Sequence, residues 1–439
     1  MNKRQFLSVF IFIALGLVIW MQLSKLLAFK ESYYHKLSYY TDNRDYDVLF
    51  FGASRIHNAI DPLQLWDEQG IASYNLSAAG ESMPLSYFAV KSALEYHTPK
   101  VVVIDGGRDL DNDVKTGQAH KCLDAVPFGK VKQEAIDYMV AHDVVEEPLD
   151  LMSSMWTYHS RIFELNQYDF ELWRGKLKGL DISTSIYKLQ RNEAQVGEKV
   201  SLEDGEAIRA FDKVMDLCRQ KNVKILMTMM PANYSAKRLG MFNSLEAYTE
   251  ENGFDALDMY AQIDDIGLDY SVDFSNKTHL NLMGAAKVTR FLGDYLADKY
   301  GLEDHRQDAS YATWHEDRKA AVDDRLQYIG YSDDAMESLM VGADQYLRTE
   351  LILRDGSIID SIHGMKEVMD FAGCKYTIDS ASLPEDKDAC LKVYDLRNQS
   401  NGGVPCIERY FVFNDDGFLS ETGDEPVGVN YFLEVDGED

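Results

Sequence analysis

Tyr46-Asp47-Val48-Leu49-Phe50-Phe51-Gly52-Ala53-Ser54-Arg55 is the stretch that decides the fold. Its first six residues form a short apolar run that predicts a buried strand, and Gly52 ends that run. A serine in a tight turn between a strand and a helix has its hydroxyl at the sheet edge, beside the free N–H groups of the helix N-terminus. Ser54 is therefore a candidate nucleophile. The alternative is that Ser54 only caps the following helix.

Three further apolar runs, at 73–76, 100–105 and 223–229, are predicted to be strands. Helical patterns lie between and after the strands, at 62–69, 84–96, 206–221 and 281–300, and in a region from 130 onward. Short apolar strands that alternate with helices indicate an α/β protein with a parallel sheet covered on both faces. In such a sheet the ligand site lies outside the carboxyl ends of the strands.

Chemistry-bearing residues follow these strands. Gly80 lies in the loop after the second strand, where a backbone N–H can approach a developing oxyanion. The third strand ends in Asp105-Gly106-Gly107-Arg108-Asp109. Late in the chain, His279 precedes a long helix and can act as a general base, with a nearby acid orienting its imidazole. Each loop alone is an ordinary turn, but four in this order favour a catalytic site.

Together the four loops resemble the SGNH (GDSL-type) hydrolase superfamily over residues 45–300. Gly52-Ala53-Ser54 matches its first block, Gly80 its second, and Asn276-Lys277-Thr278-His279-Leu280-Asn281 its last. The resemblance implies a three-layer α/β/α fold with a flavodoxin-like parallel sheet. It also implies that Ser54 is the nucleophile, that His279 is the base, and that Ser54 and Gly80 contribute to the oxyanion hole.

Two residues depart from the pattern of that family. Arg108 stands where the family has an oxyanion-hole asparagine, so a charged donor replaces an amide. Asn276 stands where the family has the aspartate that pairs with the histidine, and Asp273, three residues earlier, is the other candidate for that role. An asparagine can orient an imidazole but cannot stabilise an imidazolium as a carboxylate does.

The N-terminus predicts a membrane anchor. An uncharged run at 6–24 follows Lys3 and Arg4 and is long enough to cross a bilayer. A cleavable signal peptide is the alternative, although no small-x-small cleavage site follows the run. We expect residues 1–29 to form a cytoplasmic tip and a single-pass anchor in the cell membrane, and the bulk of the chain to be extracytoplasmic.

The remaining chain of this 439-residue protein divides by motif and charge. We expect an SGNH-like domain at 30–304, with a helical insertion at about 113–205 that either packs or covers the site, and an acidic α+β domain at 305–439. In that last region a helix is expected at 316–327 and strands at 345–355 and 410–414. The formal charge is −29 overall and −17 from residue 305 onward. Such acidity argues against nucleic acid as a partner.

Neither metal nor cofactor is expected. The five cysteines lack metal-site spacing, and two of Cys374, Cys390 and Cys406 could pair in an oxidising compartment. Acid-rich stretches such as Asp415-Asp416 lack the full spacing of a calcium loop, so a solvated acidic face is favoured over a calcium-binding adhesin.

The resemblance and the anchor together suggest the membrane-bound DltD and alginate O-acetylation type of SGNH-like protein. The first functional hypothesis is a serine acyl-esterase or O-acyltransferase that acts on cell-envelope polysaccharide or teichoic acid. The second is a catalytically degenerate SGNH-like partner of a membrane-bound O-acyltransferase that binds the polymer. The residues leave open the acyl group, the polymer and the role of the acidic domain.

Overall fold

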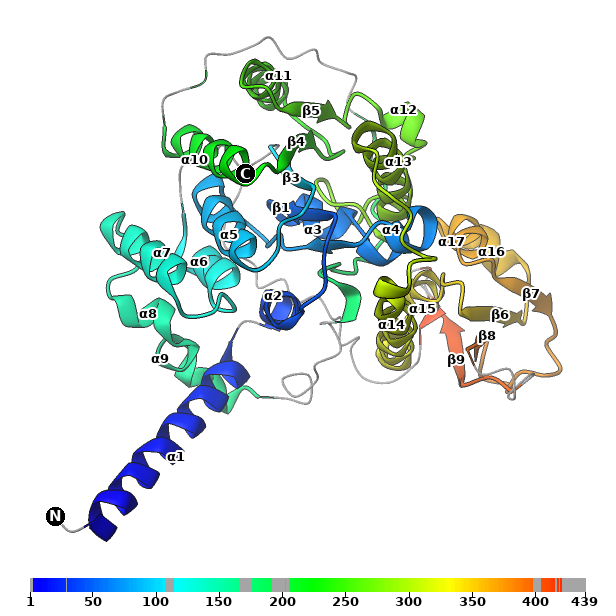
Figure 1. The fold of residues 1–439 in the computed structure, drawn as a ribbon. Helices are drawn as coiled ribbons and strands as arrows, with labels where there is room; N and C mark the ends of the chain where they lie inside the picture. Colours follow the sequence, from blue (N-terminus) through cyan, green and yellow to red (C-terminus); the bar gives the residue numbers. More distant parts are fainter. Residues whose placement is uncertain are drawn as a thin grey trace.

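The computed structural model describes residues 3–28, 30–106, 114–165, 176–191, 202, 205–397, 404–414, 417 and 419–420. A five-stranded parallel sheet with the order β2-β1-β3-β4-β5 lies at the centre of the larger unit (Figure 1). Its strands are β1 (Val48–Phe51), β2 (Ser73–Asn75), β3 (Val101–Asp105), β4 (Lys224–Met229) and β5 (Asp255–Asp258). This is the flavodoxin-like order, so the predicted α/β fold with a parallel sheet is confirmed.

Helices cover both faces of this sheet. On one face α5 (Met83–Tyr96) packs against α10 (Glu206–Lys221), and on the other α4 (Pro62–Gln69) packs against α13 (Leu282–Tyr300) (Figure 1). Asn281 caps the N-terminus of α13, and its side chain accepts the N–H groups of Met283 and Gly284. Two further helices, α11 (Ala236–Glu251) and α12 (Ile263–Ile266), flank β5 in the sequence.

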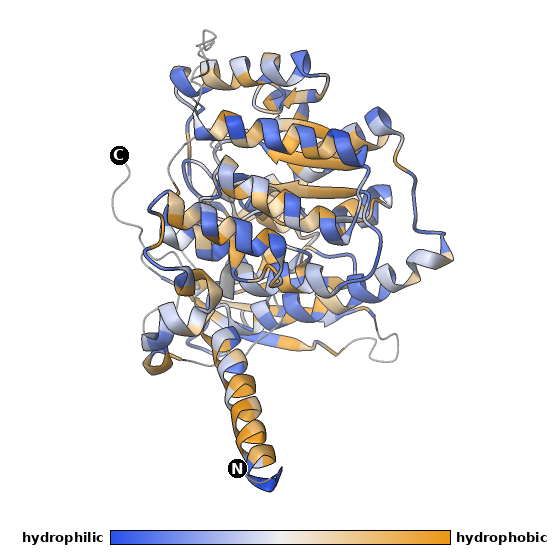
Figure 2. Ribbon diagram, turned by 60° about the vertical axis from the view of Figure 1, so that its left-hand side comes forward, coloured by the Kyte–Doolittle hydropathy of each residue, from blue (hydrophilic) through white to orange (hydrophobic). Residues whose placement is uncertain are grey.

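The N-terminal helix α1 (Lys3–Leu27) projects from the body of the protein as a single apolar rod (Figure 2). Its most apolar 18-residue window has a mean hydropathy of 2.4 and none of it is buried, which suits either a membrane anchor or a signal sequence. The next helix, α2 (Lys30–Thr41), belongs to the folded domain instead. Tyr39 of α2 is fully buried, and its hydroxyl donates a hydrogen bond to the carbonyl of Ala93.

Of the predicted insertion, the part before residue 164 is mainly helical, whereas residues 180–191 contain neither helix nor strand. It contains α6 (Thr116–Leu123), α7 (Lys130–Ala141), α8 (Pro148–Met152), α9 (Ser154–Tyr158) and the 3-10 helix η1 (His159–Phe163). These helices pack beside α5 and reach the end of α1 nearest the domain. Residues 166–175 and most of 192–204 of the expected insertion lie outside the described residues.

The C-terminal region contains helices and a second, mixed sheet. Its helices are α14 (Ala312–Tyr331), α15 (Ala335–Val341), α16 (Ser357–Ser361) and α17 (Met365–Phe371). Its sheet has the order β10-β9-β8-β6-β7, with strands β6 (Leu347–Leu353), β7 (Lys375–Ile378), β8 (Ala389–Asp395), β9 (Ile407–Phe413) and β10 (Leu419–Ser420). The β6–β7 pair is parallel and the other pairs are antiparallel. Residues 398–403, the acid-rich pair Asp415-Asp416 and residue 418 lie outside the described residues.

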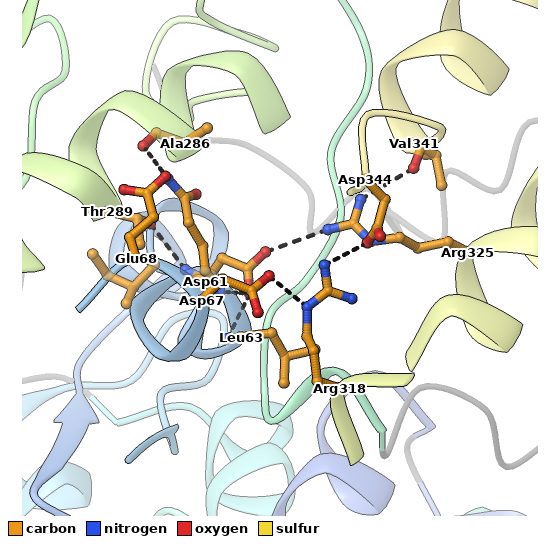
Figure 3. Close-up of polar contacts among 12 residues, drawn as sticks. Asp61, Leu63, Asp67, Glu68, Ala286, Thr289, Arg318, Arg325, Val341 and Asp344 are labelled. Carbon is orange, nitrogen blue, oxygen red and sulfur yellow. Dashed lines mark hydrogen bonds and ion pairs between the residues drawn. The ribbon is translucent and has the colours of Figure 1, made fainter. Parts of the chain in front are cut away.

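The C-terminal region docks on α4 through a buried network of charges (Figure 3). Arg318 donates to Asp67 at 2.6 Å and to Asp344 at 2.9 Å. Arg325 lies 3.4 Å from Asp61 and 3.2 Å from the same Asp344 carboxylate. Asp61 and Asp67 belong to the larger unit, which contains the parallel sheet. These contacts therefore join the larger unit to the C-terminal region across residue 305, where the sequence suggested a boundary.

All five cysteines are free thiols. Cys122 and Cys218 are buried in the larger unit, and the remaining three belong to the C-terminal region. The structure therefore contains none of the three disulfide pairings that are possible among Cys374, Cys390 and Cys406.

Candidate active site

The turn after β1 presents Ser54. Gly52 adopts a φ of 132°, which side-chain-bearing residues avoid, and Ala53 is extended. Ser54 is then the first residue of α3 (Ser54–Ala59), and Ala53 occupies the capping position. The Ser54 hydroxyl makes no capping hydrogen bond, so the alternative that this serine only caps the helix is wrong.

His279 lies in a closed loop before α13. The bridge between Phe274 and Leu280 closes the loop, and the N–H of Ser275 donates to the carbonyl of His279 at 2.9 Å. This geometry places Nε2 of His279 2.6 Å from Oγ of Ser54, although the two residues are 225 positions apart in the sequence. Both side chains are partly exposed, so a substrate can reach them.

Asn276 contacts the other nitrogen of the same imidazole. Its Oδ1 lies 3.0 Å from Nδ1 of His279 and also accepts the backbone N–H groups of Thr278, at 2.9 Å, and of His279, at 3.0 Å. Because backbone N–H groups only donate, this amide atom must be the oxygen. Nδ1 therefore carries the proton, and Nε2 is the acceptor for the Ser54 hydroxyl. The imidazole is held in the tautomer that a general base requires.

Asp273, the other sequence candidate, pairs elsewhere. Its Oδ2 lies 2.6 Å from Nζ of Lys287 and accepts the N–H of Asp269 at 2.7 Å. Burial raises the pKa of Asp273 above its usual value, although Lys287 opposes that shift. Of the two candidates, Asn276 is the one that contacts His279. Asp273 instead pairs with Lys287 and accepts the N–H of Asp269.

The loop that carries Gly80 runs beside the Ser54 turn. The N–H of Leu76 donates to the carbonyl of Phe50 at 2.8 Å, and the N–H of Ala78 donates to that of Gly52 at 3.0 Å. Gly80 follows with a φ of 73°. The N–H of Ser54 has no acceptor within its own helix, because it belongs to the first turn. The role of the Ser54 and Gly80 N–H groups as oxyanion donors stays a prediction.

Arg108 lies outside the described residues, so its place at the site stays a prediction. Two residues that the sequence did not single out lie nearby. Nε2 of Gln118 would be 2.7 Å from a Cβ added to Gly80, so a side-chain amide adjoins the second loop. Arg55 lies 3.5 Å from the buried carboxylate of Asp105 and packs over the ring of Tyr234. The position of Arg55 directly after Ser54 was the signal that the sequence offered, whereas nothing in the sequence distinguished Gln118.

Glu81 is buried beneath the turn that carries Ser54. Its carboxylate accepts the backbone N–H of Gly52 and the hydroxyl of Ser86, and it lies 3.6 Å from Nζ of Lys36 on α2. Burial raises the pKa of Glu81, and Lys36 and the hydrogen bonds counter that shift. The Gly52 turn is thus fixed by a buried acid that also ties it to the helix following α1.

Comparisons with known proteins give remote similarities only. No family model and no curated protein sequence matches the chain. Among solved structures, a proposed acylhydrolase from Bacteroides fragilis aligns with 61% of this chain and 95% of its own, at 10% identity and a TM-score of 0.31. A proposed platelet activating factor from Streptococcus pneumoniae aligns with 64% of this chain and 99% of its own, at 12% identity and a TM-score of 0.30.

A gut microbial diltiazem-metabolizing enzyme aligns with 59% of this chain at 10% identity and a TM-score of 0.30, and the alignment spans about half of that enzyme, 48%. Alignments this remote do not bear on the chemistry of the site. The chain's own geometry defines the class: a flavodoxin-like α/β protein with a Ser–His–Asn constellation at the carboxyl ends of its strands.

Proposed function

We propose that this protein is an extracytoplasmic serine acyl-esterase or O-acyltransferase that acts on cell-envelope polysaccharide or teichoic acid. The observation that carries the proposal is the 2.6 Å contact between Oγ of Ser54 and Nε2 of His279, with Asn276 on the far side of the imidazole. A hydroxyl, a base and a residue that orients the base are the parts that covalent acyl transfer requires.

In the first half of the reaction, Oγ of Ser54 attacks the carbonyl carbon of an acyl ester, and its proton passes to Nε2 of His279. The N–H groups of Ser54 and Gly80 stabilise the oxyanion of the tetrahedral intermediate. The C–O bond of the substrate ester then breaks, and His279 returns the proton to the leaving alcohol. The acyl group is left as an ester on Ser54.

In the second half, a hydroxyl oxygen attacks the acyl-Ser54 carbonyl and His279 takes its proton. The bond between the acyl carbon and Oγ of Ser54 then breaks, and His279 returns the proton to that Oγ. If the attacking molecule is water, the products are a free acid and the regenerated serine. If a polymer hydroxyl attacks, the acyl group is transferred to the polymer. The same residues perform both reactions, so access of the acceptor decides between them.

The envelope setting rests on the apolar helix α1 and on the resemblance of the four loops to membrane-bound SGNH-like proteins. Nε1 of Trp20 on α1 donates to Oγ of Ser153 in the helical insertion at 2.9 Å. Such packing supports a retained anchor over a cleaved signal. A membrane-bound O-acyltransferase in the same membrane is the proposed acyl donor or partner.

A fluorophosphonate probe tests the nucleophile. We expect the full chain in detergent to form one covalent adduct, mapped to Ser54 by peptide mass spectrometry, because the probe reacts with serines activated by a base. The Ser54→Ala variant should remain unlabelled. Labelling of the Ser244→Ala variant, whose hydroxyl lies on α11, should be unchanged. An adduct-free wild-type protein would contradict the proposal.

The degenerate-partner hypothesis is favoured by one observation, the neutral amide of Asn276 where a carboxylate would stabilise the imidazolium. In cells, polymer acylation that survives Ser54→Ala and is lost on deletion of the whole protein would establish this second function. Loss of acylation in both strains would support the enzyme.

Asn276→Asp should raise esterase activity. A carboxylate at this position would stabilise the imidazolium that forms in the transition state, and the opposite change in a serine protease lowers kcat about 10⁴-fold. Because the loop is built around an amide, we expect a smaller gain, about 10-fold, in kcat on p-nitrophenyl acetate. Asn276→Ala is the matched control and should lower kcat. A slower Asn276→Asp variant with an intact fold would argue against His279 as the base.

Gly80→Ala should weaken the oxyanion hole. A Cβ there would lie 2.7 Å from Nε2 of Gln118, and the φ of 73° disfavours any side chain. We expect kcat to fall about 10- to 100-fold with little change in KM, since the loss of one oxyanion donor acts mainly in the transition state. Gly253→Ala, at a φ of 80° with open space around it, controls for backbone strain alone.

A further inference from the structure

The end of α1 nearest the domain is bound to the segment 148–163, which comprises α8, α9 and η1 (Figure 1). Besides the bond from Trp20, the hydroxyl of Ser24 lies 2.6 Å from Oγ of Ser153. The N–H of Met155 also donates to that Ser24 hydroxyl, at 3.1 Å. The last turns of α1 therefore share a hydrogen-bonded contact with the start of α9.

Arg161 of η1 closes the same contact from the other side. Its guanidinium donates to the carbonyls of Leu27, at 2.8 Å, and Ala28, at 3.0 Å. The final carbonyls of a helix have no partners within it, so a side chain that binds them fixes the end of the helix. The orientation of α1 relative to segment 148–163 is thereby set.

Segment 148–163 exposes large apolar side chains beside this contact. The exposed residues are Leu149 (42%), Met152 (40%), Trp156 (51%), Ile162 (42%) and Phe163 (92%). The segment contains one acidic residue, Asp150, and one basic residue, Arg161, so its formal charge is zero. Soluble surfaces rarely gather so many exposed large apolar groups in so short a stretch.

The depth of this surface follows from the length of the apolar run. Residues 6–24 span about 28 Å as a helix, close to the hydrocarbon thickness of a bilayer of about 30 Å. Ser24 therefore marks the boundary between acyl chains and headgroups when α1 spans the membrane. Segment 148–163 is bonded to Ser24, so its exposed rings lie at the level where interfacial aromatics are found.

We propose that segment 148–163 is a membrane-interface element that inserts Trp156, Ile162 and Phe163 into the outer boundary of the bilayer and seats the catalytic unit on the lipid surface. The inference rests on the proposed membrane span of α1. Because the segment is neutral, apolar insertion and not attraction to anionic lipid provides the binding. Contact should therefore be equal in neutral and anionic vesicles.

Photocrosslinking in proteoliposomes tests this inference with the full chain. The photoreactive residue p-benzoylphenylalanine is placed, one site at a time, at Phe163, at Phe12 in the middle of α1, or at Ile378 on β7. Phe12 is 77% exposed and reports the span, while Ile378 is 61% exposed and reports apolar exposure in the C-terminal sheet, away from α1. Lipid adducts are counted by mass spectrometry in phosphatidylcholine vesicles with and without phosphatidylglycerol.

We expect lipid adducts at Phe12 and Phe163 in both vesicle types, at least about tenfold above those at Ile378. Adducts at Phe12 without adducts at Phe163 would overturn the interface element and leave the span intact. Absence of lipid adducts at Phe12 would overturn the span and, with it, this inference. Crosslinking of Phe163 in cells to a protein in place of lipid would also overturn it, since the surface would then be a protein-docking site.

Discussion

His279→Ala should lower kcat for ester hydrolysis by about 10²- to 10³-fold, and Ser54→Ala should reduce it to the level of the oxyanion hole alone. The base accepts the Ser54 proton through a 2.6 Å contact, so its loss leaves an unactivated hydroxyl. In a serine protease the loss of the base costs about 10⁶, and the loss of the aspartate alone costs over 10⁴. In this protein Asn276 already stands in place of that aspartate. We therefore expect His279 to contribute only the part of the 10⁶-fold effect that does not depend on the aspartate, about 10²- to 10³-fold.

Steady-state hydrolysis of p-nitrophenyl acetate by the full chain in detergent measures the loss of kcat. His142→Ala, which removes an exposed imidazole on the α7 side of the domain, is the matched control and should retain wild-type kcat. The double variant Ser54→Ala/His279→Ala should be no slower than Ser54→Ala, because the two residues act as one unit. Additive losses would mean that His279 assists some other group and would remove it from the mechanism.

Several features of the fold were readable from the sequence because they depend on local patterns. The runs around Leu49, Val102 and Leu226 are continuous and apolar, as strands buried on both faces must be, and the structure places them at the centre of the sheet. Strand β5 was missed because it lies at the sheet edge. Its sequence, Asp-Ala-Leu-Asp, is only partly buried and gives no apolar run.

Some residues of the candidate site could likewise be predicted from local sequence, and others could not. Ser54 and His279 occupy the ends of recognisable loops, so sequence reasoning could name them. The choice between Asp273 and Asn276 was not readable, because it depends on the fold of the 274–280 loop and on Lys287, which binds Asp273 from α13. Pairing of side chains from separate elements is a tertiary property that the spacing of residues in one loop does not encode.

The docking of the C-terminal region was likewise invisible in the sequence, which suggested a separate acidic domain. The boundary near residue 305 stays a prediction, but helix α14 packs closely against the larger unit. Its Trp314 is fully buried and stacks on Trp66 of α4 with ring centroids 5.1 Å apart. Nε2 of His363 lies 2.8 Å from the carbonyl of Ser271, in the loop before His279. The net charge of the C-terminal region indicated an acidic surface. It could not show that Arg318 and Arg325 of the same region are buried at the contact with α4.

Asp344→Ala should destabilise the protein by about 3–5 kcal/mol, the cost of removing one partner from a buried ion pair. The Asp344 side chain is fully buried and binds both Arg318 and Arg325 at the contact with α4 (Figure 3). Burial disfavours the charge of Arg318, but the carboxylates of Asp344 and Asp67 outweigh it and raise the pKa of Arg318. Arginine is effectively always protonated in proteins, so Arg318 stays charged when Asp344 is removed. The Asp344→Ala substitution would therefore leave the buried Arg318 cation without one of its two carboxylate partners.

Urea unfolding of the full chain in detergent, followed by tryptophan fluorescence, measures the loss. Asp323→Ala is the matched control, because Asp323 is half exposed and pairs with Arg397 at 2.7 Å; its removal should cost no more than about 1 kcal/mol. Equal effects of the two substitutions would show that the network at Asp344 contributes no more than a surface pair.

The same variant reports on the candidate site, since the charge network reaches α3, the helix that begins at Ser54. Asp61, a partner of Arg325, directly follows α3 and accepts the N–H of Leu63 at the start of α4. Thr289 of α13 donates to the carbonyl of Ala59, the last residue of α3, and accepts the N–H of Asp61. Helices α3 and α13 are thus hydrogen-bonded to each other, and α13 is also hydrogen-bonded to Asp61, which pairs with Arg325. Loosening at Asp344 should therefore increase amide exchange in α3 and α4 before it does so in α10, on the opposite face of the sheet.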